Sequence, residues 1–374
     1  MLATRLIAIN DIRTVELPVP VPQAGEVLVR VEACGICGTD RHLLHGEFPS
    51  RPPVTLGHEF SGIIVGCGAG VSIPEGTRVT CDPNTWCGNC DACRRGRVNL
   101  CENNVATGLG RDGGFAEYCA FPAHKAHVLP ADLDPRFGAF CEPLACTIHG
   151  IDIGAPKAGE RVLILGGGVI GMLALQLCAL AGAEVMLLTR SPAKQALGRS
   201  LGAAHAAPDE QAARTIWPKG ADLVVECAGV TDTVEMAPRL ARSGGRVVIL
   251  GVLAKGQKVA IEPFDLLFRE VQFLSSFINP FTQERAVDHI ATGRIRVEPL
   301  ISRTLPLERA AEIKAGITRA IQQAEPFAAI TITANPVEID EETATETVMV
   351  TAARMHRHRR AQHRALDAEL RPPP

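Results

Sequence analysis

Four cysteines close together in the chain form the pattern with the clearest chemistry. They stand at C-x2-C-x2-C-x7-C spacing in a stretch rich in Gly, Asn and Arg: Cys87, Cys90, Cys93 and Cys101. Four thiolates gathered by one short loop make a tetrahedral shell of the right size for Zn²⁺, and an all-cysteine shell leaves no open position for chemistry. The spacing therefore predicts a structural zinc site. Free or disulfide-bonded cysteines are the alternative, and they are rare at such spacing in a chain without a secretory leader.

A second set of metal-binding side chains comes from three separate segments. Cys37 lies in the run Cys-Gly-Ile-Cys-Gly-Thr-Asp, His58 in Gly-His-Glu, and Glu142 in Cys-Glu-Pro-Leu. One thiolate, one imidazole and one carboxylate can hold Zn²⁺ while leaving a position for water or substrate. This set therefore predicts a catalytic metal. Cys141, next to Glu142, remains a competing ligand.

A glycine-rich turn predicts a nucleotide site. The pattern G-x-G-x-x-G follows an apolar strand and opens a helix, and its residues are Gly166, Gly168, Val169, Ile170 and Gly171. The first glycine allows the tight turn, the second lets the backbone approach a pyrophosphate, and the third lets helix and strand pack closely. The helix N-terminus offers free N–H groups to the phosphates.

The end of the next strand bears on the choice between NAD and NADP. NAD enzymes usually place Asp or Glu there, where it accepts hydrogen bonds from the ribose 2′-OH. Here the chain reads Leu-Thr189-Arg190-Ser191, without a carboxylate, and we place Lys194 in the same site. Arg and hydroxyl groups favour a 2′-phosphate, so the sequence favours NADP over NAD. An Arg190 that simply faces solvent is the alternative.

Two hydrophobic patterns divide the chain. Up to about residue 150, short alternating strands are broken by Gly and Pro, as where Val27, Val29 and Val31 share one face. From residue 161 onward, apolar strands alternate with helices, which predicts βαβ units and a doubly wound parallel sheet, hence an α/β protein. We expect a mostly-β domain at 1–150 with a zinc lobe at about 81–110, a nucleotide domain at 151–275, a return to the first domain at 276–335, and a disordered tail at 336–374.

Composition excludes several classes of function. The 374 residues carry a formal charge of −3, and no apolar run reaches the length of a membrane span. Near-neutral charge argues against nucleic acid as a partner. Thirteen cysteines without a leader predict a reducing compartment, the cytoplasm, with thiolates held by metal.

Together these motifs, in this order, resemble the zinc-dependent medium-chain dehydrogenases, the alcohol and polyol dehydrogenase family, over roughly residues 1–330. The resemblance implies a GroES-like, mostly-β catalytic domain and a Rossmann cofactor domain, with two zinc ions per subunit. It also implies NAD(P)-dependent hydride transfer from a secondary alcohol, giving the ketone. Homodimers or homotetramers are implied as well, and we expect the strand Arg246–Leu250 to extend a sheet edge across the interface.

The resemblance carries roles to single residues. Cys37 and His58 match the two shared ligands of the catalytic zinc, and Glu142 matches the third ligand of the polyol, threonine and glucose branch. Glu59 matches a carboxylate that lies beside the zinc and, in some members, coordinates the zinc directly. We therefore count Glu59 among both the metal ligands and the catalytic residues.

Three further matches concern the proton. Thr39 matches the hydroxyl that bonds the substrate oxygen, Asp40 the partner of the histidine ligand, and His42 the outer end of a proton relay. A plain surface histidine is the alternative for His42. Six other cysteines are interpreted as ordinary small buried residues: Cys34, Cys67, Cys119, Cys146, Cys178 and Cys227.

The substrate is the least determined feature. Glu142 and the segment Asp82-Pro-Asn84 resemble sugar-alcohol and aminocyclitol dehydrogenases, and a vicinal diol is our first expectation. L-threonine, aldoses and simple alcohols remain alternatives. A non-catalytic nucleotide-binding protein, or a zinc-ribbon nucleic-acid binder with a basic tail, is a remote one.

Overall fold

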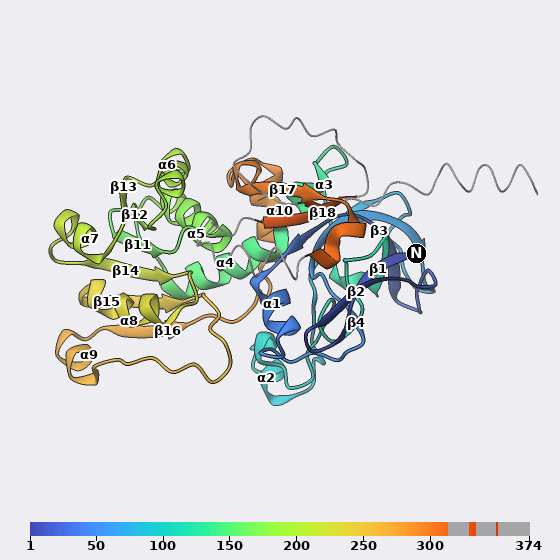
Figure 1. Ribbon diagram of the computed structural model, residues 1–374, viewed down its shortest axis with the longest axis horizontal. Coiled ribbons are helices and arrows are strands. Elements are labelled where there is room, and N and C mark those ends of the chain that lie inside the picture. Colours follow the sequence, from blue (N-terminus) through green and yellow to red (C-terminus); the bar gives the residue numbers. More distant parts are fainter. Residues whose placement is uncertain (313–328, 334–348, 351–374) are drawn as a thin grey trace, which may run out of the picture.

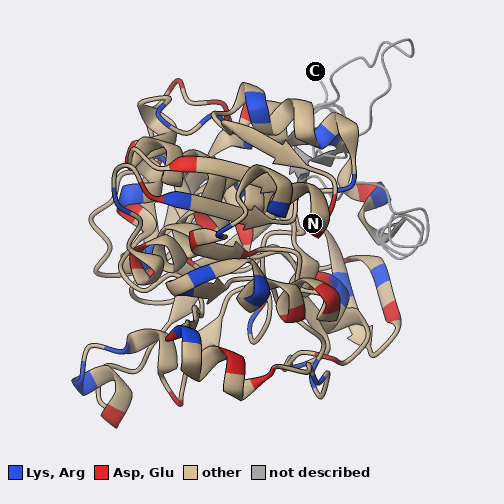
Figure 2. Cartoon of the chain, turned by 90° about the vertical axis from the view of Figure 1, so that its left-hand side faces the viewer, with Lys and Arg blue, Asp and Glu red and all other residues tan. Residues whose placement is uncertain are grey.

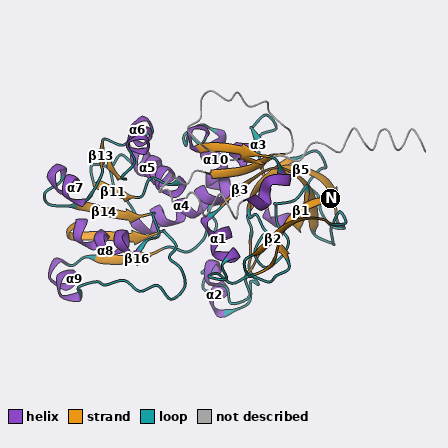
Figure 3. Cartoon of the chain, viewed as in Figure 1, coloured by secondary structure: helices purple, strands orange, loops and turns teal. Residues whose placement is uncertain are grey.

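The computed structural model describes residues 1–312, 329–333 and 349–350. Figure 1 shows two regions side by side, each built around its own sheets. Figure 3 shows loops and strands dominating the region that contains the N-terminus, and helices flanking the sheet of the other. The predicted tail at 336–374 lies outside the described residues, except for 349–350.

The N-terminal region is mostly β. Its main sheet has the order β10-β6-β5-β3-β18-β17, with β9 on β3 and β19 on β18, and smaller sheets have the orders β2-β1-β4 and β7-β8. Alternation explains β3, because Val27, Val29 and Val31 point into one core while the residues between them are half-buried. The strands are β1 (Leu2–Ala8), β2 (Asp11–Glu16), β3 (Glu26–Ile36), β4 (Val54–Thr55), β5 (Glu59–Cys67), β6 (Arg78–Cys81), β7 (Asn84–Thr85), β8 (Val105–Ala106), β9 (Tyr118–Pro122), β10 (Ala126–Val128), β17 (Ile301–Leu305), β18 (Ala329–Thr333) and β19 (Met349–Val350).

The second region is a doubly wound parallel sheet. Its strand order is β13-β12-β11-β14-β15-β16, and every pair is parallel. Along β11, Val162 and Ile164 enter one core and Leu163 and Leu165 enter the other, so both faces of the strand are buried. The strands are β11 (Arg161–Leu165), β12 (Glu184–Leu188), β13 (His205–Ala207), β14 (Ala221–Glu226), β15 (Ala241–Ile249) and β16 (Gln272–Ser275).

Helices complete both regions. The long α4 packs against α5 and α10 and passes residue 150, so no break in the backbone marks that predicted boundary. The chain then returns through α10, and β17 and β18 join the sheet of β3. The helices are α1 (Gly38–Leu44), α2 (Asp91–Arg94), α3 (Pro135–Gly138), α4 (Cys141–Gly154), α5 (Val169–Leu180), α6 (Pro192–Ser200), α7 (Glu210–Ile216), α8 (Thr231–Leu240), α9 (Pro263–Arg269) and α10 (Gln283–Ala291).

One expectation about the sheet is wrong. Arg246–Leu250 does not form an edge: β15 covers most of it and lies between β14 and β16, with β16 as the outer strand. The continuous apolar run reflects burial on both sides rather than an interface.

The described helices and one side of the molecule bear on membrane and nucleic-acid binding. In the described part of the chain, no helix combines the length and the apolar character that a membrane crossing requires. Figure 2 shows acidic and basic residues interspersed over the side it presents, so that side lacks the single-sign face that nucleic-acid binding uses.

Candidate active site and metal centres

The four predicted cysteines meet at one point. Their sulfur atoms lie within 4.8 Å of one another, with Cys90 and Cys101 3.9 Å apart and Cys87 and Cys101 3.6 Å apart. A tetrahedral zinc with Zn–S bonds of about 2.3 Å places its sulfurs roughly 3.8 Å apart. The four cysteines therefore fit a structural zinc.

The ionisation of the cysteine thiols in this loop also favours a bound cation. Hydrogen bonds from the backbone N–H groups of Asn89 and Cys90 lower the pKa of Cys87 to about 6. Loss of water contact and bonding with Cys90 raise the pKa of Cys93 to about 12. Four neighbouring thiols cannot all ionise without compensation, and a divalent metal supplies it.

The second cluster is assembled by strand register. Gly35 of β3 pairs with Glu59 of β5, which brings Cys37, the N-cap of α1, next to the turn that carries His58. The ligand atoms of Cys37, His58 and Glu59 all lie within 4.8 Å of one another. Gly57 makes this turn possible, because its φ is +90° and a Cβ there would lie 2.6 Å from the backbone nitrogen of Phe115.

Glu142 lies beside this cluster without joining the 4.8 Å group. Its carboxylate is buried in the first turn of α4 and interacts electrostatically with His58. Cys146, one turn later, donates its S–H to Glu142 Oε1 at 3.4 Å. Cys146 thus has a polar partner in the site, which a single cysteine in a helical run did not reveal. Cys141 is fully buried and bonds with Thr80 instead.

Buried like charges make the cluster unfavourable without a cation. Burial, reinforced by the charge of Glu142, raises the pKa of Glu59 to about 8, while His58 opposes the shift. Burial alone would lower the pKa of His58, but Cys37, Asp40 and Glu142 raise it well above its usual value. A thiolate and two carboxylates around one imidazole suit a divalent metal, so the donor set fits zinc.

The proton-handling residues surround the same cluster. Cys37 Sγ lies 3.5 Å from Thr39 Oγ1. Asp40 accepts the Cys37 N–H at 2.9 Å, and its Oδ1 lies 3.7 Å from His58 Nδ1. Asp40 Oδ1 and His58 Nδ1 are both buried and lack a hydrogen bond. A small rotation of either side chain would let them bond to each other. His42 is only 4 % exposed.

His42 has a partner that the sequence did not suggest. Its Nδ1 lies 2.6 Å from Glu47 Oε2, and the Glu47 side chain is 36 % exposed. This hydrogen bond lowers the pKa of Glu47. The alternative of a plain surface histidine does not describe this buried, bonded side chain.

The glycine turn has the geometry that a pyrophosphate needs. Gly166 has φ +106°, and a Cβ on Gly171 would lie 1.9 Å from the Gly166 carbonyl oxygen. Gly168 is the N-cap of α5, followed by Val169 and Ile170, and a Cβ there would meet nothing within 4 Å. The backbone is therefore closely packed between Gly166 and Gly171, whereas the space beside Gly168, where a pyrophosphate would bind, is open.

The second strand ends beside this turn. A Cβ on Gly167 would lie 3.1 Å from both Thr189 Oγ1 and Lys194 Cδ, so both side chains border the turn. Arg190 is exposed, whereas burial of Lys194 lowers its pKa to about 8. The structure thus gathers hydroxyl and cationic groups here.

Asp82-Pro-Asn84, which the sequence associates with substrate class, is buried in a polar network instead. Asp82 accepts from Lys125 Nζ at 2.6 Å and from Asn279 Nδ2 at 3.2 Å. Asn84 Nδ2 donates to Asn279 Oδ1 at 2.7 Å. Asn279 follows β16, so this network ties the zinc lobe to the returning chain. A hydrogen-bonded structural role explains the motif without a substrate contact, because Asp82 and Asn84 are 4 % and 6 % exposed.

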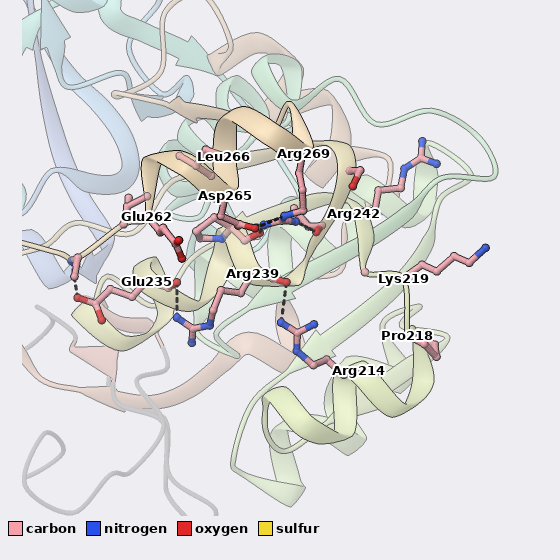
Figure 4. A pocket seen from close by; sticks show the side chains of 16 residues that line it. Arg214, Pro218, Lys219, Glu235, Arg239, Arg242, Glu262, Asp265, Leu266 and Arg269 are labelled. Atoms are coloured by element: carbon pink, nitrogen blue, oxygen red, sulfur yellow. Dashed lines mark hydrogen bonds and ion pairs between the residues drawn. The ribbon is translucent and has the colours of Figure 1, made fainter.

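A surface cavity of about 710 Å³ lies elsewhere (Figure 4). It is lined by Arg214, Arg239, Arg242 and Arg269 among others, and carboxylates pair with all four. Its residues include Gly220 and Ala241, at the amino ends of β14 and β15. Ligands of open α/β sheets bind at the carboxyl ends of strands, so this cavity is distinct from the nucleotide site.

Comparison with known proteins agrees with this organisation. The family models for an alcohol dehydrogenase GroES-like domain and a zinc-binding dehydrogenase match residues 23–131 and 169–292. D-arabinitol dehydrogenase 1 of Uromyces fabae is 33% identical over 310 residues, which is 80% of this chain and 88% of that protein. The 2-dehydro-3-deoxy-L-galactonate 5-dehydrogenase of Pseudoalteromonas atlantica is 33% identical over 316 residues, 82% of this chain and 92% of that protein.

A solved structure is more similar still. A dehydrogenase from Sinorhizobium meliloti 1021, described as zinc-binding and bound to NADP, superposes with a TM-score of 0.82 at 52% identity, covering 84% of this chain and 95% of the other. By sequence, fold and donor set, this chain belongs to the zinc-dependent medium-chain dehydrogenase family, in its polyol-dehydrogenase-like branch.

Proposed function

We propose that the protein oxidises a secondary alcohol of a polyol or sugar acid to the ketone, with NADP as hydride acceptor and two zinc ions per chain. The observation that carries the proposal is the grouping of Cys37, His58 and Glu59 within 4.8 Å, beside the buried Glu142. Such a donor set is of little use to a protein that only binds nucleotides.

In this proposal, Cys37, His58 and Glu142 hold the catalytic zinc, with Glu59 as a further ligand. The metal supplies Lewis-acid polarisation of the alcohol oxygen. Asp40 orients the His58 ring, because a carboxylate beside the second ring nitrogen fixes the tautomer of a ligating histidine. The four-cysteine loop holds the second, structural zinc.

Thr39 takes up the hydroxyl proton while its own hydroxyl proton passes outward, toward His42 and water. Its Oγ1 lies 3.5 Å from the Cys37 sulfur, beside the residues that would hold the metal. His42 passes a proton outward, and its 2.6 Å hydrogen bond to the partly exposed Glu47 extends the relay to solvent.

The preference for NADP is supported by two observations. Thr189, Arg190 and Lys194 stand where NAD enzymes carry a carboxylate, and the 52% identical dehydrogenase is described as bound to NADP. Gly166, Gly168, Val169, Ile170 and Gly171 cradle the pyrophosphate.

The substrate class follows from the relatives. One is named for a five-carbon sugar alcohol and another for position 5 of a sugar acid. We propose a vicinal diol, since a neighbouring hydroxyl can serve as an extra oxygen ligand. The cytoplasm is the proposed compartment, supported by thirteen cysteines that are all free.

The test is a panel of polyols, sugar acids, L-threonine and simple alcohols, each assayed with NADP and with NAD while zinc is quantified. Cys37→Ala should lower kcat/KM by about 1,000-fold or more, because metal polarisation contributes several kcal/mol, and should lose one zinc per chain. Cys67→Ala, a matched change outside the cluster, should keep both. Turnover retained in a zinc-depleted Cys37→Ala protein would refute the proposal. L-threonine or a simple alcohol as the only substrate would refute the polyol assignment alone.

A further inference from the structure

A buried carboxylate lies at the carboxyl end of the cofactor sheet. Glu226 is the last residue of β14 and is 0 % exposed. Its Oε1 accepts hydrogen bonds from the N–H groups of Ala228 and Gly229, at 2.8 and 3.0 Å, and from Thr233 Oγ1 at 2.7 Å. Burial raises the pKa of Glu226, and these three hydrogen bonds oppose the rise. A buried carboxylate is costly, so packing alone does not explain its presence at this strand end.

Glu226 joins two loops that follow neighbouring strands. Its Oε1 holds loop 227–230, between β14 and α8, while its backbone carbonyl accepts the first two N–H groups after β15, at 2.9 and 3.0 Å. The two loops touch, because a Cβ on Gly251 would lie 2.3 Å from the Gly229 nitrogen and 2.4 Å from Glu226 Oε2. One residue therefore fixes the spacing between loop 227–230 and loop 250–252.

Both loops also carry exposed residues. Val230 and Val252, one from each loop, are 50 % and 51 % exposed, and Ala228 is exposed as well. The first loop lies against the glycine turn, since a Cβ on Gly166 would be 3.0 Å from the Ala228 nitrogen. The loops thus extend the turn as an exposed, partly apolar surface, and apolar side chains with a few polar groups are typical of small-ligand sites.

The strand order indicates which half of a dinucleotide this surface would meet. The order reverses between β11 and β14, and a dinucleotide lies across such a switch point with one mononucleotide on each half of the sheet. The glycine turn follows β11, and the proposed 2′-phosphate residues Thr189 and Lys194 follow β12. The adenosine half therefore belongs to that side, and the nicotinamide half falls to the ends of β14 and β15.

We propose that Glu226 is a positioning residue for the nicotinamide half of the cofactor. It holds loops 227–230 and 250–252 at the spacing that this half requires and, being fully buried, does not touch it. The choice of a carboxylate follows from its chemistry, because an ionised oxygen accepts several hydrogen bonds and makes stronger ones than a neutral acceptor. The inference rests on the cofactor of the proposed function.

Binding titrations that compare a dinucleotide with its own adenine half test this role. The pairs are NADP with adenosine 2′,5′-bisphosphate and NAD with AMP, and the pair that the wild type prefers is used. Glu226→Leu should weaken the dinucleotide by about 10- to 100-fold and the adenine half by less than about two-fold, because the loops lose charge-assisted hydrogen bonds. Glu226→Gln keeps an accepting oxygen and should recover most of the affinity.

Asp222→Leu is the matched control. It removes a carboxylate at the amino end of the same strand, where Asp222 accepts the Arg161 N–H at 2.9 Å, and it should lower stability without changing either affinity. Gly251→Ala tests the loops from the other side, because its Cβ would press on Gly229 and Glu226. It should reproduce the selective loss of the dinucleotide, and it carries the test if Glu226→Leu does not fold.

Circular dichroism shows which variants are folded. The inference is overturned if folded Glu226→Leu or Gly251→Ala binds the dinucleotide as the wild type does, or weakens the dinucleotide and the adenine half equally. It is also overturned if Asp222→Leu shows the same selective loss. A wild type that binds neither dinucleotide overturns the proposed function together with this inference, whereas the other outcomes overturn this inference alone.

Discussion

Lys194 should decide the proposed preference for NADP. Its side chain borders the glycine turn beside Thr189, and burial lowers its pKa to about 8. Among the residues that the structure describes, no carboxylate pairs with Lys194, so a 2′-phosphate would meet an ammonium group that these residues have not already neutralised. Lys194→Met keeps most of the volume and removes the charge.

The magnitude follows from the chemistry of the contact. A hydrogen bond to a charged group contributes about 1.5–3 kcal/mol, so Lys194→Met should weaken NADP binding by about 10- to 150-fold. Arg190 is exposed, so Arg190→Ala should cost less than about 1 kcal/mol, a factor of roughly five or less. NAD has no 2′-phosphate, and its affinity should stay within about two-fold.

Fluorescence titration with both nucleotides measures these changes, followed by kcat/KM for each. Lys219→Met is the matched control. It removes a lysine from the cavity at the amino ends of the strands (Figure 4) and should alter neither affinity. If Lys194→Met weakens NAD and NADP equally, the lysine contacts a shared part of the nucleotide, or shapes the turn, and the reasoning fails.

Three further outcomes are expected. NADP affinity should be complete below pH 8 and fall as the pH rises through about 8, because bound phosphate favours the charged form of Lys194; a flat pH profile, measured beside NAD, contradicts this. Lys125→Met should lower the free energy of unfolding in urea by about 3–5 kcal/mol, because it leaves Asp82 buried and uncompensated; a loss below about 1 kcal/mol would mean the pair behaves as an exposed one. Cys93→Ser should cost one zinc per chain and some stability while NADP binding persists; an unchanged zinc content argues against the four-cysteine site.

Motifs whose members are close in sequence could be predicted well. The four cysteines between residues 87 and 101 are gathered by one loop, and the glycine turn needs only its own strand and helix. In both cases only a short stretch of chain has to be ordered to bring the residues together, which costs little entropy. The alternation of apolar strands and helices likewise predicts the doubly wound sheet, because each βαβ unit is local.

Features that depend on distant segments could not be predicted by residue pattern alone. Pairing of β3 with β5 brings Cys37 to Glu59, and only resemblance to a family anticipated it. Glu47, as the partner of His42, and Cys146, as the partner of Glu142, had no signal in the sequence. Glu47 follows the end of α1, where the turn after the helix brings it back to the histidine.

The sequence by itself determined the local features: which loop gathers cysteines, which turn has the shape that a pyrophosphate needs, and which strands are apolar on both faces. The tertiary structure decided which distant segments these local features contact. It buried Asp82 and Asn84 against Asn279, some 195 residues away, and it made β16 rather than β15 the outer strand. The reason is physical: covalent geometry constrains neighbours within a loop or a turn, whereas contacts between distant segments are selected by the packing of the whole chain.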